Sequence, residues 1–205
     1  IKRNKAIILN GSGVNLSYFS ESKILGNKII FLLIARLLKE KGILEYVEAS
    51  KNLKKKYPNV IFQIIGYTDN SSSSIKTNII KRWEKSSYID FLGYKNDVRP
   101  YLKKSSVYVL PSYREGTPRS VLEAMSIGRA IITTDVPGCR ETVQNRKNGF
   151  LVPAKNILSL ENKMSQFITN PVLIKQMGRE SRKIAEKKYD VKKVNDHILR
   201  AMEIL

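Results

Sequence analysis

Short apolar runs rich in β-branched residues alternate along this chain with segments whose apolar residues recur at helical spacing. The apolar runs predict strands at residues 6–9, 28–35, 60–65, 88–92, 107–110 and 130–133. The intervening segments predict helices at residues 40–56, 75–86, 98–104 and 119–127, with breakers such as Pro58 and Gly128 at their ends. Repeated strand–helix–strand units imply right-handed crossovers, so we expect an α/β fold built on a doubly wound, Rossmann-like parallel sheet.

The pattern changes after residues 149–153, where we expect the sheet to end. From about Ile157 onward it is wholly helical, with breaks at residues 170–171 and 189–190. The last helix, residues 191–205, has apolar residues at helical spacing and is expected to bury one face, with core packing favoured over a contact with another domain. The prediction is one domain over residues 1–205, with a sheet part at about 5–153 and a helical tail at about 157–205.

The four serines at residues 71–74, which follow Asp69 and Asn70, form the only low-complexity stretch of the chain. They lie between a predicted strand and a predicted helix. We interpret them as a flexible surface loop that serves as a plain linker.

The start and the cysteine content of the chain indicate its setting. The chain begins at Ile1 and lacks the apolar run and cleavage signals of a secretory peptide, so we interpret it as a piece of a longer protein. Its longest strongly apolar stretch, residues 29–35, is far shorter than the roughly 20 residues that cross a bilayer, and we expect a soluble domain. The single cysteine, Cys139, can form no internal disulfide, which favours a reducing compartment, the cytosol.

Histidine chemistry and metal sites find little support in the sequence. The only histidine, His197, lies in a helical pattern and is interpreted as an ordinary helix residue, and no histidine-based triad can be assembled. No second cysteine or histidine lies near Cys139 with metal-ligand spacing. We therefore expect no metal site and no cofactor.

The net charge of +19, from 37 Lys and Arg against 18 Asp and Glu, has three explanations. These are a solvated basic surface, attraction to an anionic membrane or a phosphate-rich substrate, and nucleic-acid binding. The lysines are spread along predicted helix faces and are not gathered around stacking aromatic residues. This dispersal favours the solvated surface, keeps peripheral contact with the cytosolic face of a membrane open, and argues against nucleic acid.

Glycines, cations and hydroxyl residues follow several predicted strands directly. In a doubly wound sheet, ligands bind in the crevice outside the carboxyl ends of the strands. Residues 111–118 follow one such strand and lead into a helix, with Thr117 suited to the N-cap and Pro118 to the first helical position. Free backbone N–H groups and the positive end of the helix dipole predict a diphosphate site there, and Gly116 permits a close approach to the backbone.

Glu115 and Glu123 flank this predicted phosphate site, one in the loop and one on the helix. An ionised carboxylate accepts hydrogen bonds from two donors, so it suits a vicinal diol of a sugar. The alternative is that the two residues are a helix-start charge and a solvated helix residue. Arg36 and Lys41, which follow another strand, shift the balance because they supply cations to the same crevice for a departing diphosphate.

Five segments in order resemble the C-terminal, donor-binding domain of family-four retaining GT-B glycosyltransferases, the glycosyl transferases group 1. They are residues 10–14 (NGSGV), 35–42 (ARLLKEKG), 91–94 (FLGY), 114–125 (REGTPRSVLEAM) and 148–152 (NGFLV). The most specific part is the pair of glutamates separated by seven residues, Glu115 and Glu123. The resemblance spans nearly the whole chain and implies that an N-terminal acceptor domain is absent from it.

The resemblance also implies roles for individual residues. Arg36 and Lys41 would bind the donor diphosphate, Glu115 would lie beside the transferred sugar, and Glu123 would accept the ribose hydroxyls; Arg36, Lys41 and Glu115 are the implied catalytic residues. The implied donor-binding residues are Gly11, Ser12, Gly13, Arg36, Lys41, Gly93, Tyr94, Glu115, Gly116, Thr117, Arg119, Ser120 and Glu123.

One position departs from the commonest pattern of this family. Pro118 stands where many relatives carry a residue with a backbone N–H, so that donor is lost here. Thr117, Arg119 and Ser120 keep theirs, and the Arg119 side chain is a candidate to compensate.

The implied activity is transfer of a sugar from a nucleoside diphosphate donor to a hydroxyl acceptor with retained anomeric configuration. The sequence around Glu115 most resembles that of bacterial surface-polysaccharide transferases, which implies a UDP-sugar donor and a glycan or polyprenyl-diphosphate-linked acceptor. Two rival classes stay open. A nucleotide-sugar-modifying enzyme such as an epimerase would need a different set of carboxylates and histidines, and a basic nucleic-acid-binding module would need a basic stripe with stacking aromatics.

Overall fold

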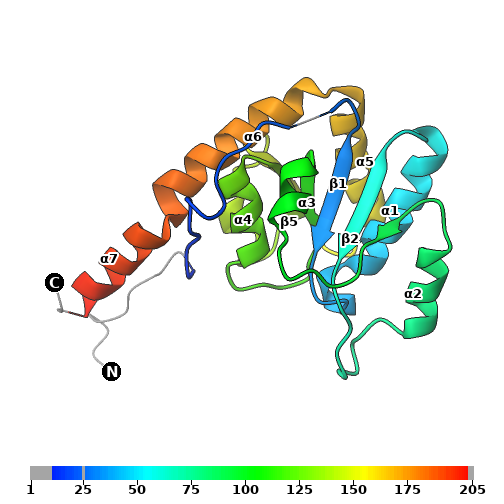
Figure 1. Ribbon diagram of the computed structural model, residues 1–205, viewed down its shortest axis with the longest axis horizontal. Coiled ribbons are helices and arrows are strands. Elements are labelled where there is room, and N and C mark those ends of the chain that lie inside the picture. Colours follow the sequence, from blue (N-terminus) through cyan, green and yellow to red (C-terminus); the bar gives the residue numbers. More distant parts are fainter. Residues whose placement is uncertain (1–10, 25, 203–205) are drawn as a thin grey trace.

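The computed structural model describes residues 11–24 and 26–202 (Figure 1). The strand predicted at residues 6–9 lies outside the described residues. Over the described part, six parallel strands form one sheet in the order β3-β2-β1-β4-β5-β6. The strands are β1 (Ile30–Ile34), β2 (Ile61–Ile65), β3 (Asp90–Phe91), β4 (Val107–Leu110), β5 (Ala130–Thr134) and β6 (Gly149–Val152). This arrangement confirms the predicted doubly wound sheet.

The central strands are apolar because helices cover both of their faces. Every residue of β4 and β5 is buried, which explains why these segments read as continuous apolar runs instead of alternating ones. The edge strand β3 has only two residues, and its Asp90 is exposed. It is shorter than the predicted strand at 88–92, since it pairs on one side only, with β2.

Alternate residues of the strands enter two separate hydrophobic cores. Phe31 and Leu33 pack in the core under α1 (Ile43–Lys56), α2 (Thr77–Glu84) and α5 (Ile157–Thr169). Leu32 points to the opposite face, in the core under α3 (Arg99–Lys104) and α4 (Arg119–Ile127). The result is a three-layer α/β domain (Figure 1).

The segment after β1 departs from the predicted helix at 40–56. A 3-10 turn at Lys39–Lys41 comes first, and α1 begins only at Ile43. Gly42 separates them because it has left-handed backbone dihedrals, φ 68° and ψ 25°, which interrupt an α-helix. Lys41 therefore lies on a tight turn at the end of the sheet and not on the helix.

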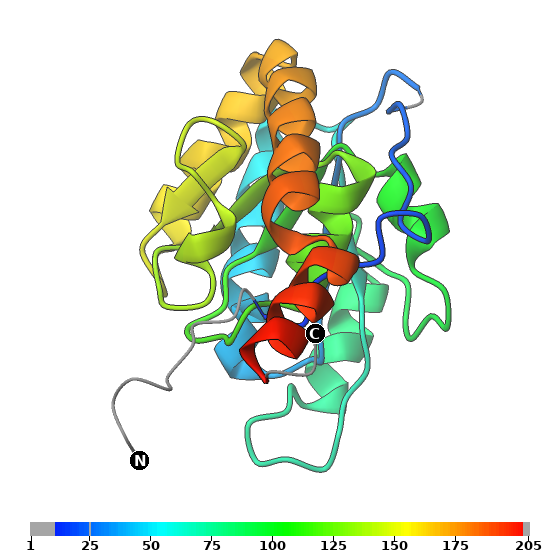
Figure 2. The ribbon, with the colours of Figure 1, turned by 90° about the vertical axis from the view of Figure 1, so that its left-hand side faces the viewer.

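The helical tail begins at α5 and continues as α6 (Val172–Ile184), a π-helical turn at Ala185–Tyr189, and α7 (Val191–Ala201). The predicted start near Ile157 and the breaks at 170–171 and 189–190 are confirmed. Figure 2 shows α6 and α7 following one another along the side of the domain. In the part of the chain with described coordinates, no helix is both long and apolar enough to span a membrane.

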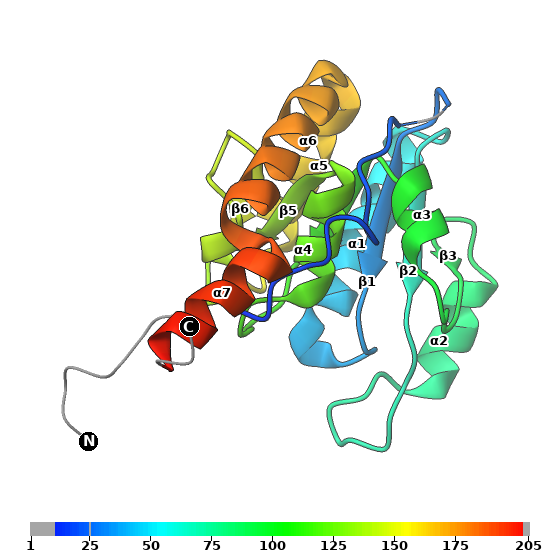
Figure 3. The ribbon, with the colours of Figure 1, turned by 60° about the vertical axis from the view of Figure 1, so that its left-hand side comes forward.

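The expectation that the last helix packs one whole face into the core is wrong. Val194 is its only buried residue among those described, and Met202, just beyond its end, is 63% exposed. The reason is geometric: α7 leaves the body of the domain after its first turn, so its later residues have no core to reach (Figures 1 and 3).

Candidate functional site

The order of strands places the candidate site at the carboxyl ends of β1 and β4. These two strands are neighbours, and the chain winds outward in opposite directions from them, through β2 and β3 on one side and β5 and β6 on the other. This is the switch point at which open α/β sheets bind ligands. Arg36 and Lys41 follow β1, and residues 111–117 follow β4, so the structure brings together the two segments that the sequence singled out.

The loop after β5 packs directly against the loop that carries Glu115. A Cβ atom on Gly138 would lie 1.7 Å from the carbonyl oxygen of Gly116 and 2.3 Å from that of Glu115, and Gly138 has φ +84°. Only glycine fits this position. Gly11 is packed similarly, because a Cβ atom there would lie 2.5 Å from Cβ of Thr117. Gly11, one of the implied donor-binding residues, thus lies against the loop between β4 and α4.

Lys41 and Glu115 form the best-buried ion pair of the site. Nζ of Lys41 lies 2.7 Å from Oε1 of Glu115, and the two side chains are 19% and 12% exposed. The hydroxyl of Ser112 donates to the same Oε1 at 2.7 Å. Ser112 is fixed in turn, because its carbonyl oxygen accepts from the Thr134 hydroxyl at the end of β5. Charge-assisted hydrogen bonds of this kind hold both charges in place at the edge of the sheet.

Glu123 lies on α4, and burial changes its chemistry. Its side chain is 13% exposed, and Nε of Arg119 is 3.4 Å from its Oε1. Burial raises the pKa of Glu123 to about 7, although Arg119 acts to lower the pKa. The interpretation of this residue as a solvated helix charge is therefore wrong, since most of its surface is enclosed.

Tyr108, on β4, is fully buried and reaches the end of β1. Its hydroxyl donates to the carbonyl oxygen of Ile34 at 3.0 Å. Burial raises the pKa of Tyr108 far above its ordinary value, and the nearby charges of Glu123 and Glu115 raise it further.

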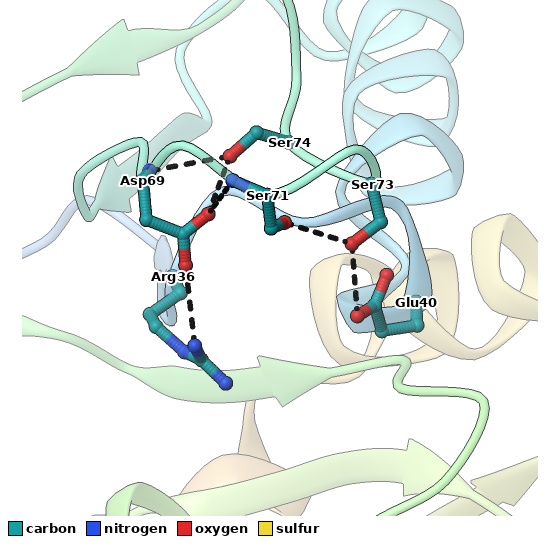
Figure 4. Close-up of polar contacts among 6 residues, drawn as sticks. All are labelled: Arg36, Glu40, Asp69, Ser71, Ser73 and Ser74. Atoms are coloured by element: carbon teal, nitrogen blue, oxygen red, sulfur yellow. Dashed lines mark hydrogen bonds and ion pairs between the residues drawn. The ribbon is translucent and has the colours of Figure 1, made fainter.

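Arg36 faces a different partner. Its Nη1 lies 3.2 Å from Oδ2 of Asp69, in the loop after β2, and its side chain is 52% exposed (Figure 4). Residues 71–74 of that loop lie at the surface between β2 and α2, as predicted, but they are more than a plain linker. Asp69 and the serines are joined to one another and to the turn at Lys39–Lys41 by hydrogen bonds.

The start of α4 differs from the prediction in its capping. Pro118 occupies the N-cap position with φ −70° and ψ 111°, the helix begins at Arg119, and no side chain caps it. Thr117 is not the N-cap, because it packs against Gly11 and lies one residue too early. Among the described residues, the backbone N–H groups of Arg119 and Ser120 have no acceptor, so the helix end keeps the free donors expected there.

The remaining predicted donor-binding residues make their contacts with partners other than Lys41 and Glu115. Tyr94 is exposed after β3, and its ring packs against that of Tyr67 with centroids 5.6 Å apart. Gly93 accepts a hydrogen bond from the Gly66 N–H through its carbonyl oxygen. Gly13 packs against the start of α7, because a Cβ atom there would lie 2.8 Å from Cα of Val191. Ser12, between Gly11 and Gly13, is exposed.

Three residues of the site were missed by sequence reasoning: Asp69, Tyr108 and Ser112. Asp69 follows β2 closely, and the rule of the strand ends could have found it. Ser112 lies in the segment 111–118 that the sequence singled out, but its role as a donor to Glu115 gave no signal, and neither did the position of Tyr108, because both depend on which loops meet. No group of three or more His, Cys, Asp or Glu side chains suited to a metal occurs among the residues with described positions.

Comparison with known proteins gives relatives over most of the chain. The family model of glycosyl transferases group 1 matches residues 16–184. The chain is 33% identical over 186 residues to N,N'-diacetylbacillosaminyl-diphospho-undecaprenol alpha-1,3-N-acetylgalactosaminyltransferase of Campylobacter jejuni, covering 84% of this chain and 48% of that protein. It is 31% identical over 175 residues to UDP-Gal:alpha-D-GlcNAc-diphosphoundecaprenol alpha-1,3-galactosyltransferase of Escherichia coli, covering 79% and 45%.

The chain thus spans about half the length of these curated relatives. Among solved structures, Anabaena HepE in complex with UDP has a TM-score of 0.82 at 18% sequence identity, over 94% of this chain and 56% of that one, which shows the same fold. The family match covers far more than half of the sequence and confirms the resemblance. The chain belongs to the family of glycosyl transferases group 1.

Proposed function

We propose that this chain is the donor-binding domain of a retaining glycosyltransferase that moves a sugar from UDP to a lipid-linked or other glycan acceptor. The observation that carries the proposal is the Lys41–Glu115 pair at the switch point of the sheet, with Ser112 on the same carboxylate oxygen. Lys41 supplies a cation for a diphosphate, and Glu115, in direct contact with it, supplies an acceptor for a sugar hydroxyl.

Electrostatics accounts for catalysis in this proposal. When the bond between the anomeric carbon and the diphosphate breaks, negative charge develops on the leaving oxygens. Lys41, Arg36 and the free N–H groups at the start of α4 face that charge, and the helix dipole adds to them. Glu115 orients the donor sugar, and Glu123 accepts the ribose hydroxyls. No metal ion and no cofactor has a role.

The donor nucleotide and the acceptor class are inferred from relatives. The Escherichia coli relative is named for a UDP-Gal donor, and both curated relatives are named for undecaprenol diphosphate acceptors. A polyprenyl-linked acceptor is anchored in a membrane, and a domain of net charge +19 would be drawn to an anionic lipid surface. We therefore propose a cytoplasmic location at the membrane surface, without a nucleic-acid partner.

A second domain of the same protein is part of the proposal. The chain matches about half of its relatives' length, and α7 leaves the body of the domain with Ile198 half-buried and Met202 exposed. Such a partly apolar helix fits a contact with an acceptor-binding domain. The acceptor must be held against the anomeric carbon, so the chain alone should bind the donor nucleotide but transfer sugar poorly. Efficient transfer by the chain alone would contradict this division of labour.

Calorimetric titration with UDP at physiological salt tests the proposal. Wild type should show saturable binding, and Lys41→Ala and Glu123→Ala should each weaken it by about tenfold or more, because each loses hydrogen bonds to a charged group. Glu48→Ala removes an exposed carboxylate of α1, 45% exposed, and serves as the control without effect. A short DNA duplex is titrated in parallel. Salt-sensitive DNA binding without UDP binding would overturn the proposal and make the charge the functional feature.

A further inference from the structure

The loop after β2 makes a set of contacts that the donor-site proposal does not use. It comprises residues 69–74, here called the serine loop, and Figure 4 shows it lying over Arg36 and Glu40. Sequence reasoning treated it as a linker. Its hydrogen bonds instead converge on one side chain, Asp69, and on the segment that carries the two candidate phosphate-binding cations.

The carboxylate of Asp69 is fixed by its own loop. Oδ1 accepts from the backbone N–H of Ser71 at 3.0 Å and from the hydroxyl of Ser74 at 2.9 Å. The hydroxyl of Ser74 also accepts from the backbone N–H of Asp69 at 3.2 Å. These bonds lower the pKa of Asp69, the Ser71 N–H most of all. With Oδ1 engaged twice, Oδ2 is left to meet Nη1 of Arg36 at 3.2 Å.

The serine loop is also tied to the segment from Leu37 to Lys41. Leu37 donates its backbone N–H to Tyr67, and Ile75 donates back to Leu37, each at 2.8 Å. Lys39 donates its backbone N–H to the carbonyl oxygen of Ser73 at 3.0 Å, and the Ser73 hydroxyl donates to Oε1 of Glu40 at 3.1 Å. These bonds fix Asp69 relative to the backbone of Arg36, so the ion pair does not depend on two freely moving side chains.

The contact uses only part of the guanidinium. Arg offers five N–H donors in a planar fork, and a phosphate or carboxylate is best bound by two parallel donors. Asp69 meets Nη1 through one oxygen, and another guanidinium nitrogen points away from the carboxylate in Figure 4. A carboxylate that holds one side of the fork leaves other donors for a second anion.

We propose that Asp69 is a positioning residue: supported by the serine loop, it orients Arg36 so that the free side of the guanidinium meets the donor diphosphate. This inference rests on the proposed function, since it assigns the ligand of Arg36 from it. It extends the site to a third strand end, that of β2. Asp69 acts through Arg36 and does not touch the donor.

The direction in which removal of Asp69 changes UDP affinity distinguishes two roles: orientation of Arg36 and mere neutralisation of its charge. Asp69 is an anion near a site for an anionic ligand, so removing it should strengthen UDP binding if only its charge mattered. Removing a residue that orients Arg36 should weaken binding instead. The pair is solvent-exposed on the Arg36 side, and exposed pairs add little stability, so Asp69 variants should fold normally.

A double-mutant cycle by UDP calorimetry tests the proposal on wild type, Asp69→Ala, Arg36→Ala and the double variant. Loss of one oriented charge-assisted contact predicts that Asp69→Ala weakens UDP binding by about threefold to tenfold in wild type and by less than about twofold in the Arg36→Ala background. Asp69→Asn keeps an oxygen for Ser71 and Ser74 but turns an amide toward Arg36, so it should be as weak as Asp69→Ala. This variant separates support of the loop from contact with Arg36.

Two controls match the charge and the loop. Asp97→Ala removes another exposed carboxylate that is paired with an arginine, Arg99 at 2.8 Å, and should leave UDP binding unchanged. Ser72→Ala removes an exposed hydroxyl of the same loop that makes no hydrogen bond to the other described residues, and should also have no effect.

Unchanged or tighter UDP binding by Asp69→Ala would overturn the positioning role. Equal weakening in both backgrounds would overturn it as well, because it would reveal a structural effect that bypasses Arg36. In either case UDP binding by wild type would leave the proposed function standing. Absence of UDP binding by wild type would overturn both proposals.

Discussion

Replacing Glu123 by glutamine should stabilise the fold while weakening UDP binding at the candidate site. Glutamine has the shape of the protonated acid and carries no charge, so it needs no desolvation of a carboxylate. Burial raises the pKa of Glu123 from 4.5 to about 7. The folded chain therefore binds the proton more tightly than the unfolded chain. Between pH 4.5 and about pH 7 the unfolded chain has lost the proton while the folded chain keeps it, so the stability of the wild type falls as pH rises.

The magnitude follows from the two pKa values. A displacement from 4.5 to about 7, at about 1.4 kcal/mol per pH unit, corresponds to about 3 kcal/mol of unfolding free energy lost above neutral pH. At pH 8, Glu123→Gln should exceed the wild type by about this amount, which for a domain of this size raises Tm by roughly 10 °C. At pH 4.5 the difference should shrink to under about 0.5 kcal/mol, because the folded wild type is then protonated.

Urea unfolding at pH 4.5 and pH 8 measures both values. Glu48→Gln, on the exposed face of α1, is the matched control and should differ from wild type by less than about 0.5 kcal/mol at either pH. A stability difference between Glu123→Gln and wild type that is the same at both pH values would refute the reasoning. A variant less stable than wild type at pH 8 would refute it more strongly, since the ion pair with Arg119 would then outweigh burial.

Three further predictions concern Gly138, Cys139 and the pH dependence of UDP binding. Gly138→Ala should destabilise the fold by about 2 kcal/mol or more in urea unfolding, since its Cβ would overlap the carbonyl oxygen of Gly116 at φ +84°; near wild-type stability would mean that the loops separate freely. Burial raises the pKa of the Cys139 thiol, so native chain should react with iodoacetamide at least about 100-fold more slowly than urea-unfolded chain; equal rates would show that the thiol is accessible. The ribose hydroxyls should donate to ionised Glu123, so UDP affinity should rise between pH 6 and pH 8 more steeply in wild type than in Glu123→Gln. Parallel pH profiles in calorimetry would exclude that role and leave only the titration of UDP itself.

The sheet was predictable from sequence because its central strands are buried on both faces. The segment at Val107–Leu110 was predicted with its observed bounds, and so was the helix at Arg119–Ile127. The deviations occur where backbone conformation or the extent of tertiary packing decides the outcome and not the local apolar pattern. Gly42 divides the predicted helix after β1, and β3 shortens at the edge of the sheet. α7 keeps a helical pattern with little to pack against, which sequence alone cannot reveal.

The sequence predicted which residues belong to the candidate site better than it predicted which of their side chains contact one another. The strand-end rule and the family motif located Lys41, Glu115 and Glu123, but not which side chains hold one another. The 71–74 stretch is a surface loop as its composition predicted, but composition does not reveal that the Ser71 N–H and the Ser74 hydroxyl bind the carboxylate of Asp69. The burial of Glu123 depends on packing of α4 over β4, which no local spacing encodes.

The pairing within the site bears on which ligand it can select. The three cations named for the site do not add to the net charge of +19, because each is matched in an ion pair: Arg36–Asp69, Lys41–Glu115 and Arg119–Glu123. An anion that drew Lys41 and Arg119 from their partners would leave Glu123 without its ion-pair partner and Glu115 with the Ser112 hydroxyl as its donor, at a cost for each of about 1–3 kcal/mol. DNA phosphates offer no hydroxyls to compensate. In a nucleoside diphosphate sugar, the phosphates can bind the two cations while the ribose and sugar hydroxyls donate to the two carboxylates. The proposed selectivity therefore arises from the carboxylates as much as from the cations.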